Sequence, residues 1–251
     1  MFKKISGIAA LAVALLIVSA GTAKADALAD VQKGIHDKIV KLTSFSYKMK
    51  MVSETNDPNF SNKTQADATI AYVKKDAKIL YRVEMTTKMV MKMQDNETKT
   101  DSKSLSIYDG DFVYSYSESN GVKQATKSKF DPSTNTDPFD QLKLFKEQEK
   151  QFAFKVLPDE TVDGKPCWVL EMTPKDEQMR AYVGKMVACY DKETGITLKT
   201  TNYDAKGKAT GTTTMSDIKT NISIPAEQFK FTPPPGVEVT DTTKTDAAKG
   251  S

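Results

Sequence analysis

Four methionines of one short stretch, Met85, Met89, Met91 and Met93, occupy only odd positions, so an extended chain presents their thioethers on one face. Soft sulfur groups of this kind can hold Cu(I), and they also form adaptable apolar surfaces that repack around varied guests. Same-face neighbours on a strand lie about 6.6 Å apart, too far for adjacent sulfurs to converge without bending of the side chains. We therefore favour an apolar lining, with a Met-rich Cu(I)-binding protein and an ordinary packed sheet face as the alternatives.

Side chains suited to catalysis are few in this sequence. His36 is the single histidine, and it falls in a helical stretch where a polar position on an exposed face is expected. Asp109 and Asp111 flank Gly110 and are explained by turn chemistry. We find no phosphate-binding loop and no nucleophile elbow in the sequence, and we predict no enzyme activity, no catalytic residue and no cofactor.

The two cysteines, Cys167 and Cys189, are expected to form a structural disulfide, with a metal pair as the alternative. An antiparallel pairing of residues 166–173 with 183–190 places the cysteines opposite each other. The same register pairs apolar with apolar and acid with base on that face: Val169 with Val187, and Glu171 with Lys185. The spacing is far from C-x-x-C, so redox catalysis is not expected.

The N-terminal residues have the pattern of a targeting segment. Lys3 and Lys4 precede an apolar run at 8–20, and Ala23-Lys24-Ala25 has the small-x-small form of a cleavage site. We predict a signal peptide over residues 1–25, cleaved after Ala25, and a mature chain outside the cytoplasm. That segment holds three of the 36 basic residues and no acid, so the remaining bases equal the 33 acids. A neutral chain without a basic block argues against nucleic acid as a partner.

The elements that carry these residues alternate mainly with period two, which predicts strands with one apolar face. Asp109-Gly110 and Asp163-Gly164 mark hairpin turns, so the strands form an antiparallel meander. Apolar residues at helical spacing predict a helix over 27–43, and Asp137-Pro138 predicts the start of a second helix that ends near residue 150. We expect one mainly β domain over 26–239, an incomplete barrel whose apolar face the helices cover, followed by a flexible tail over 240–251.

Three segments resemble a known family. Phe229-Lys-Phe-Thr-Pro-Pro-Pro-Gly-Val-Glu-Val239, Leu105-Ser-Ile-Tyr-Asp-Gly-Asp-Phe-Val-Tyr-Ser-Tyr116 and Leu42-Thr-Ser-Phe45 are similar to the closing motif, central hairpin and first-helix exit of LolA/LolB-like periplasmic lipoprotein carriers. The resemblance implies an open antiparallel half-barrel with helices over its concave apolar face. It also implies a carrier that binds and releases lipoprotein acyl chains or another lipidic ligand, with an inner-membrane transporter and an outer-membrane acceptor as possible partners.

One departure from that family concerns lid closure. Carriers commonly show an arginine in the turn before the third strand, where this chain has Lys75 within Val73-Lys-Lys-Asp-Ala-Lys78. Lysine lacks the planar fork with which arginine can hold several carbonyl groups at once.

Ligand-contacting residues are predicted from the alternation along the strands and from the apolar stripe of the second helix. Those predicted to line or cap an apolar cavity are Tyr47, Met49, Met51, Tyr81, Val83, Met85, Met89, Met91, Met93, Ile107, Phe112, Tyr114, Leu142, Phe145, Trp168, Leu170 and Met186. An error of one residue in register would turn a whole set to the opposite face.

Overall fold

The computed structural model describes residues 19–57, 59–94, 96–131 and 137–243, with only the backbone for 19–25. The predicted cleavage segment at 1–25 lies mostly outside these residues, as does the predicted tail from residue 244 onward. Four helices are described: α1 (Ser19–Ile39), α2 (Gln141–Gln148), α3 (Glu177–Tyr182) and the short 3-10 helix η1 (Ala226–Phe229). Both predicted helices are present, and α3 was not predicted.

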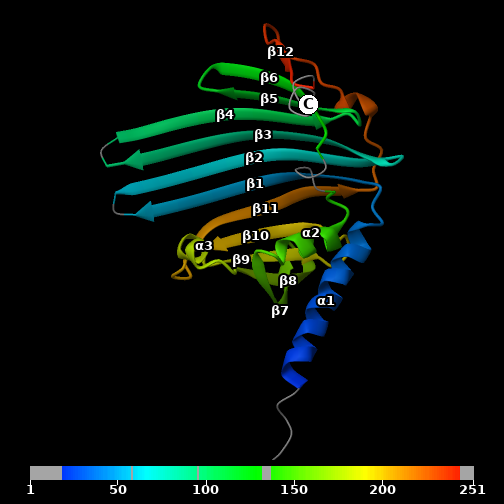
Figure 1. The fold of residues 1–251 in the computed structure, drawn as a ribbon, viewed down its shortest axis with the longest axis vertical. Helices are drawn as coiled ribbons and strands as arrows, with labels where there is room; N and C mark the ends of the chain where they lie inside the picture. Colours follow the sequence, from blue (N-terminus) through cyan, green and yellow to red (C-terminus); the bar gives the residue numbers. More distant parts are fainter. Residues whose placement is uncertain (1–18, 58, 95, 132–136, 244–251) are drawn as a thin grey trace, which may run out of the picture.

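Twelve strands form one sheet (Figure 1). They are β1 (Ser44–Asp57), β2 (Phe60–Lys75), β3 (Lys78–Met93), β4 (Asn96–Tyr108), β5 (Phe112–Ser119), β6 (Val122–Lys129), β7 (Phe152–Val162), β8 (Lys165–Pro174), β9 (Lys185–Asp191), β10 (Thr197–Tyr203), β11 (Ala209–Thr220) and β12 (Val239–Asp241). Their spatial order is β12-β6-β5-β4-β3-β2-β1-β11-β10-β9-β8-β7. The chain therefore builds two antiparallel meanders that join where β11 returns beside β1, and the predicted open half-barrel is confirmed.

Antiparallel pairing sorts the connections into two ends of the sheet. At one end, which we call the proximal end, α1 enters β1 and the turns at 75–78, 108–112 and 191–197 lie together. At the other, the distal rim, lie the connections at 57–60, 93–96, 119–122, 174–185 and 203–209. The methionine-bearing half of β3 runs toward the distal rim.

Helices α1 and α2 cover one face of the sheet, which we call the inner face. Ile35 of α1 and Phe145 of α2 pack with Leu170 of β8 in one buried cluster, and Ile39 packs with Phe45 of β1 in a second. Helix α2 begins after Asp140, whose carboxylate accepts a hydrogen bond from Lys143 N at 3.1 Å. The expected start near Asp137 is three residues early, because Asp137 instead accepts from Phe139 N in the preceding turn.

The C-terminal segment covers the opposite, outer face. Phe229 is buried between Leu80 and Ile107, and the Phe231 ring stacks on Tyr114 with 5.4 Å between ring centroids. Strand β12 then pairs in parallel with β6, opposite 125–127. The tail predicted to start at residue 240 therefore begins as part of the sheet.

The predicted register of the cysteine hairpin is wrong by two residues. Cys167 lies opposite Asp191, and Cys189 lies opposite Val169, so the two cysteines are diagonal neighbours. Both are buried free thiols in this structure, and they pack in one cluster on the outer face. A shift of two residues keeps every side chain on its expected face. The predicted ion pair also forms, on the diagonal, with 2.7 Å between Lys185 Nζ and Glu171 Oε2.

Candidate ligand-binding surface

The inner face carries an aromatic row at its proximal end. Phe45, Tyr72, Tyr81 and Tyr108 lie opposite one another on β1, β2, β3 and β4. Their successive ring centroids are 5.1, 6.0 and 5.9 Å apart. Burial raises the pKa of Tyr47 and of Tyr72, so these phenols stay neutral at physiological pH. This end of the inner face is therefore mainly apolar and aromatic.

Toward the distal rim the inner face becomes a surface of thioethers over small side chains. Met49 lies opposite Ala68 of β2, which lies opposite Met85 of β3; Met51 lies opposite Ala66 in the next row. Both alanines are buried, whereas the methionines remain partly exposed. We call this surface the methionine trough; its members are Met49, Met51, Ala66, Ala68, Met85, Met89, Met91 and Met215.

Helix α1 fills the other part of the inner face, over β8 and β9. Leu170 is fully buried, and Trp168 and Met186 pack against the same cluster as Ile35 and Phe145. A side chain at Gly34 of α1 would meet the Trp168 ring at 3.0 Å. The residues predicted to line the far side of a cavity therefore form a packed core while α1 is in place.

A small pocket of about 120 Å³ separates the helices from the sheet, between the aromatic row and the turn at Gly195. Pockets that take drug-sized ligands measure roughly 300–1,000 Å³, so this space is too small for a lipid chain unless the helices move. A larger pocket of about 580 Å³ lies mostly on the outer face beside Pro234, among polar side chains such as Lys50 and Thr69. Met49 and Met85 of the predicted apolar surface also contribute to its lining.

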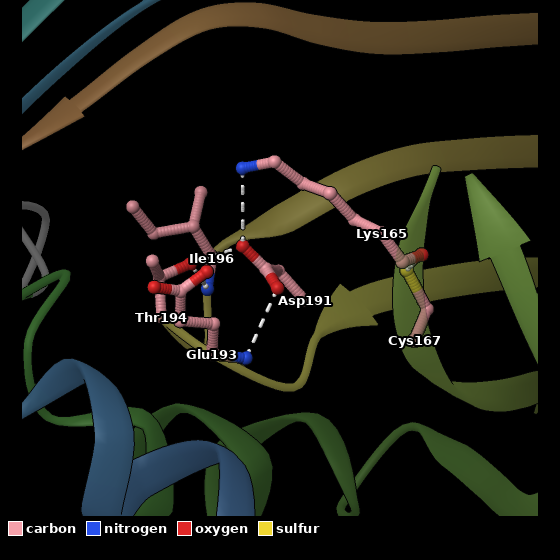
Figure 2. Close-up of polar contacts among 6 residues, drawn as sticks. All are labelled: Lys165, Cys167, Asp191, Glu193, Thr194 and Ile196. Carbon is pink, nitrogen blue, oxygen red and sulfur yellow. Dashed lines mark hydrogen bonds and ion pairs between the residues drawn. The ribbon is translucent and has the colours of Figure 1, made fainter. Parts of the chain in front are cut away.

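The turn between β9 and β10 lies against α1. Figure 2 shows the polar contacts of Asp191 within this turn. Asp191 is 1% exposed; its carboxylate accepts from Glu193 N at 3.0 Å and from Thr194 Oγ1 at 2.9 Å, and it lies 3.4 Å from Lys165 Nζ. These bonds hold Gly195 at a φ of +74° directly beneath α1. A side chain there would collide with the Ile35 carbonyl oxygen, so the glycine permits the close approach of the helix.

Polar contacts also fasten the two helices. Lys74 Nζ donates to Val40 O at the end of α1 at 2.6 Å and lies 4.3 Å from the centre of the Phe139 ring. Burial lowers the pKa of Lys74, partly offset by Asp137. Between the helices, Gln32 donates to Glu149 at 2.8 Å. Lys74 thus makes the contact with α1, whereas Lys75 is exposed at the end of β2.

His36 lies between α1 and α2 rather than on the exposed helix face that was expected. Its side chain is 20% exposed, and its Nδ1 lies 3.9 Å from Asp140 Oδ1. The turn assignment of Asp109 is confirmed, because its carboxylate accepts from the backbone of Asp111 and Phe112 at 2.8 Å each. Asp111 pairs with Lys78 at 2.7 Å.

Three predicted ligand residues face the wrong way. Ile107 and Tyr114 lie opposite each other on the outer face, where they contact the C-terminal segment. Phe112 shares that face, and its ring centroid lies 3.8 Å from Lys127 Nζ. Leu142 of α2 is 41% exposed and does not cap the surface as predicted.

The remaining predicted residues share the inner face. On β1 and β3 they are Tyr47, Met49, Met51, Tyr81, Val83, Met85, Met89, Met91 and Met93, and on or beneath the helices they are Phe145, Trp168, Leu170 and Met186.

Sequence reasoning missed several members of the inner face. Strand β2 alternates with period two in the same way as β1. Its residues on the inner face are Ala66, Ala68, Ile70 and Tyr72. Met215 of β11 stands among threonines, so no apolar period identified it. Among the described residues, no helix is both long enough and apolar enough to cross a membrane.

Comparisons by sequence give a family match and a curated relative. A family model described as "-like: Uncharacterized protein" matches residues 85–229. An uncharacterized protein of Methanocaldococcus jannaschii is 28% identical over 138 residues, which is 54% of this chain and 37% of that relative. This chain thus spans little more than a third of that relative's length.

Several solved structures share features of the fold at low identity. MucB of Pseudomonas aeruginosa is 17% identical with a TM-score of 0.46, over 83% of this chain and 63% of MucB. An uncharacterized conserved protein from Thermus thermophilus is 11% identical with a TM-score of 0.48, over 86% and 99% of the two chains. LprF from Mycobacterium bovis is 11% identical with a TM-score of 0.37, over 78% and 96%. Likenesses of this degree carry no argument about function.

Proposed function

We propose that this chain, which belongs to the family matched over residues 85–229, is a periplasmic protein that binds and releases an acylated or otherwise lipidic ligand. The observation that carries the proposal is the inner face of the sheet: α1 and α2 cover its apolar part over β8 and β9, and the methionine trough, in which Thr64 and Thr87 also lie, forms the part toward the distal rim. Flexible thioethers over small side chains suit a surface that must fit guests of varied shape. The sequence resemblance to lipoprotein carriers leads to the same class of ligand.

Binding requires no bond to be made or broken. An acyl chain would lie along the trough between β1 and β3 and extend toward the aromatic row when α1 moves aside. The space beneath the helices is about 120 Å³, so the depth of entry depends on that movement. A bound chain gains roughly 0.8 kcal/mol for each methylene group removed from water, and this gain offsets the loss of the contacts of α1 by an amount that grows with chain length.

Native mass spectrometry of the protein purified from its own cell envelope, followed by organic extraction, tests the proposal. We expect near-stoichiometric lipid or acylated protein. An empty protein that takes up Cu(I), and loses it when Met89, Met91 and Met93 are changed to leucine, would overturn the lipid proposal in favour of a copper-binding function.

A paired variant tests the surface itself. Met89→Asp with Met91→Asp places two charges in the trough, and we expect at least tenfold weaker binding of a fluorescent fatty acid with an unchanged circular dichroism spectrum. Val90→Asp is the matched control, because Val90 points to the outer face between Lys63 and Lys99, where a carboxylate is tolerated. Loss of folding in the double variant alone would instead show that these methionines are packed core.

A further inference from the structure

Exposed apolar side chains occur at several points along the distal rim. Seven large apolar residues are exposed among the described residues, and four of them lie there: Met93 (56% exposed), Val122 (71%), Met179 (38%) and Tyr182 (82%). They come from three different connections, between β3 and β4, between β5 and β6, and between β8 and β9. The trough leads to this rim, since Met85, Met89 and Met91 precede Met93 along the inner face of β3.

Helix α3, which carries Met179 and Tyr182, is held in place by hydrogen bonds at both of its ends. Asp176 caps the start of the helix by accepting a hydrogen bond from Met179 N at 2.8 Å. At its end, Val183 N donates to Met179 O at 2.8 Å. Gly184 N then donates to Tyr203 O at 2.8 Å, so the connection is anchored to the neighbouring strand. The exposure of Tyr182 therefore belongs to an ordered helix.

The chemistry of the rim favours a bilayer over a flat protein partner. Each apolar position has a cation as a close neighbour in sequence: Lys92 precedes Met93, Lys123 follows Val122, and Arg180 stands between Met179 and Tyr182. Such pairs let an apolar group enter the headgroup region while the long basic side chain reaches the phosphates. Tyrosine is also enriched at membrane–water interfaces.

Charge at the rim is mixed, which sets the expected mode of binding. Lys92 pairs with Glu97 at 3.0 Å, and Arg180 pairs with Glu177 at 3.4 Å. Neutralised cations give little attraction to anionic lipid at long range, so contact depends mainly on apolar insertion.

We propose that the distal rim docks transiently on a phospholipid bilayer through Met93, Val122, Met179 and Tyr182, so that a lipidic ligand passes between bilayer and trough without crossing water. This inference rests on the proposed function, which it deepens by naming the surface through which the ligand enters and leaves.

Flotation with phosphatidylcholine vesicles tests the docking. The rim variant combines Val122→Ser, Met179→Ser and Tyr182→Ser, and the control combines Val40→Ser with Val52→Ser, two exposed valines away from the rim turns. We expect at least a fivefold lower bound fraction for the rim variant, no change for the control, and little effect of salt or of added phosphatidylglycerol. Equal binding of the rim variant, or binding seen only with phosphatidylglycerol at low salt, would overturn the proposal.

A second measurement separates the docking from ligand binding. The rim variant should still bind a monomeric fluorescent fatty acid in solution, whereas the Met89→Asp, Met91→Asp variant should lose that binding and still float with vesicles. Wild-type protein that binds fatty acid yet never floats would refute the docking and leave the proposed function standing. Wild-type protein that floats but binds no fatty acid would contradict the proposed function.

Discussion

Gly195 is the residue on which the seating of α1 depends most directly. It has a positive φ and lies against the backbone of Ile35, whereas Gly164 has a similar φ of +77° with no atom within 4 Å of an added Cβ. Both Gly→Ala changes therefore incur the same backbone strain, and only Gly195→Ala adds the collision. We expect Gly195→Ala to lower the free energy of unfolding by about 1–3 kcal/mol more than Gly164→Ala does.

Chemical denaturation of the two glycine variants gives this comparison, and hydrogen exchange locates the change. The additional loss should appear as faster exchange in α1. Equal destabilisation by both variants would mean that α1 does not rest on the turn.

The buried thiol of Cys189 makes the free energy of unfolding fall as the pH rises above 9. Burial raises the pKa of its thiol from 9.0 to about 11, so the folded state favours the neutral thiol. The resulting stabilisation is complete below pH 9 and is lost as the pH rises toward 11, with a slope of up to about 1.4 kcal/mol per pH unit.

Unfolding free energies of wild type and Cys189→Ala between pH 8 and 11 isolate this contribution, because Tyr190, whose pKa burial raises to about 12, titrates in both proteins. The alanine variant should show the shallower slope. Parallel slopes would contradict a free thiol and would be explained by a disulfide, since a disulfide has no proton to lose.

At the scale of elements, the end of α1 is fastened to β2 by one side chain. Lys74→Met removes the hydrogen bond to Val40 O and the cation above Phe139, each worth about 1 kcal/mol at a partly exposed position. We expect exchange in the last turns of α1 to become about tenfold faster, measured by mass spectrometry. Lys75→Met is the matched control, because Lys75 is exposed, and the same acceleration in both variants would rule out this role for Lys74.

How far an element could be predicted from sequence depended on how many of its faces are buried. Strands β1 and β3 each have one apolar face near the distal rim, so alternation placed Met49 and Met85 correctly. In β4 and β5 the outer face is also buried, by Phe229 and Phe231, so alternation could not show that Ile107 and Tyr114 face outward. Helix α3 has six residues, too few for an apolar period, although Asp176-Glu177 offered an N-terminal signal.

Pairwise contacts were harder to predict than faces. The expected pairing of Cys167 with Cys189 satisfied every side-chain pattern, yet a slip of two residues satisfies the same patterns equally well. The depth of the binding surface was also beyond sequence reasoning. Trp168 and Leu170 are apolar whether they line a cavity or pack beneath α1, and only the position of the helix decides between these roles.

At the scale of the whole molecule, the two halves of the inner face should respond oppositely to a ligand. Loading with a long-chain fatty acid should slow hydrogen exchange in β1, β2 and β3 and speed it in α1, because the chain covers the trough and displaces the helix. Hydrogen–deuterium exchange with and without ligand measures both effects. Slower exchange in β1, β2 and β3 with no change in α1 would show that the ligand stays in the open trough.

In the proposed function, Ala66 and Ala68 would set how deep a guest can sit, although the methionines make most of the surface above them. A larger residue at either position would raise the floor of the trough and leave its apolar character intact. Slender saturated chains would then still fit where ring-bearing or branched lipids would not. Under the proposed function, the choice among lipids by thickness would therefore depend on two buried methyl groups, and variation at these positions would change the preferred cargo without altering the fold or the docking rim.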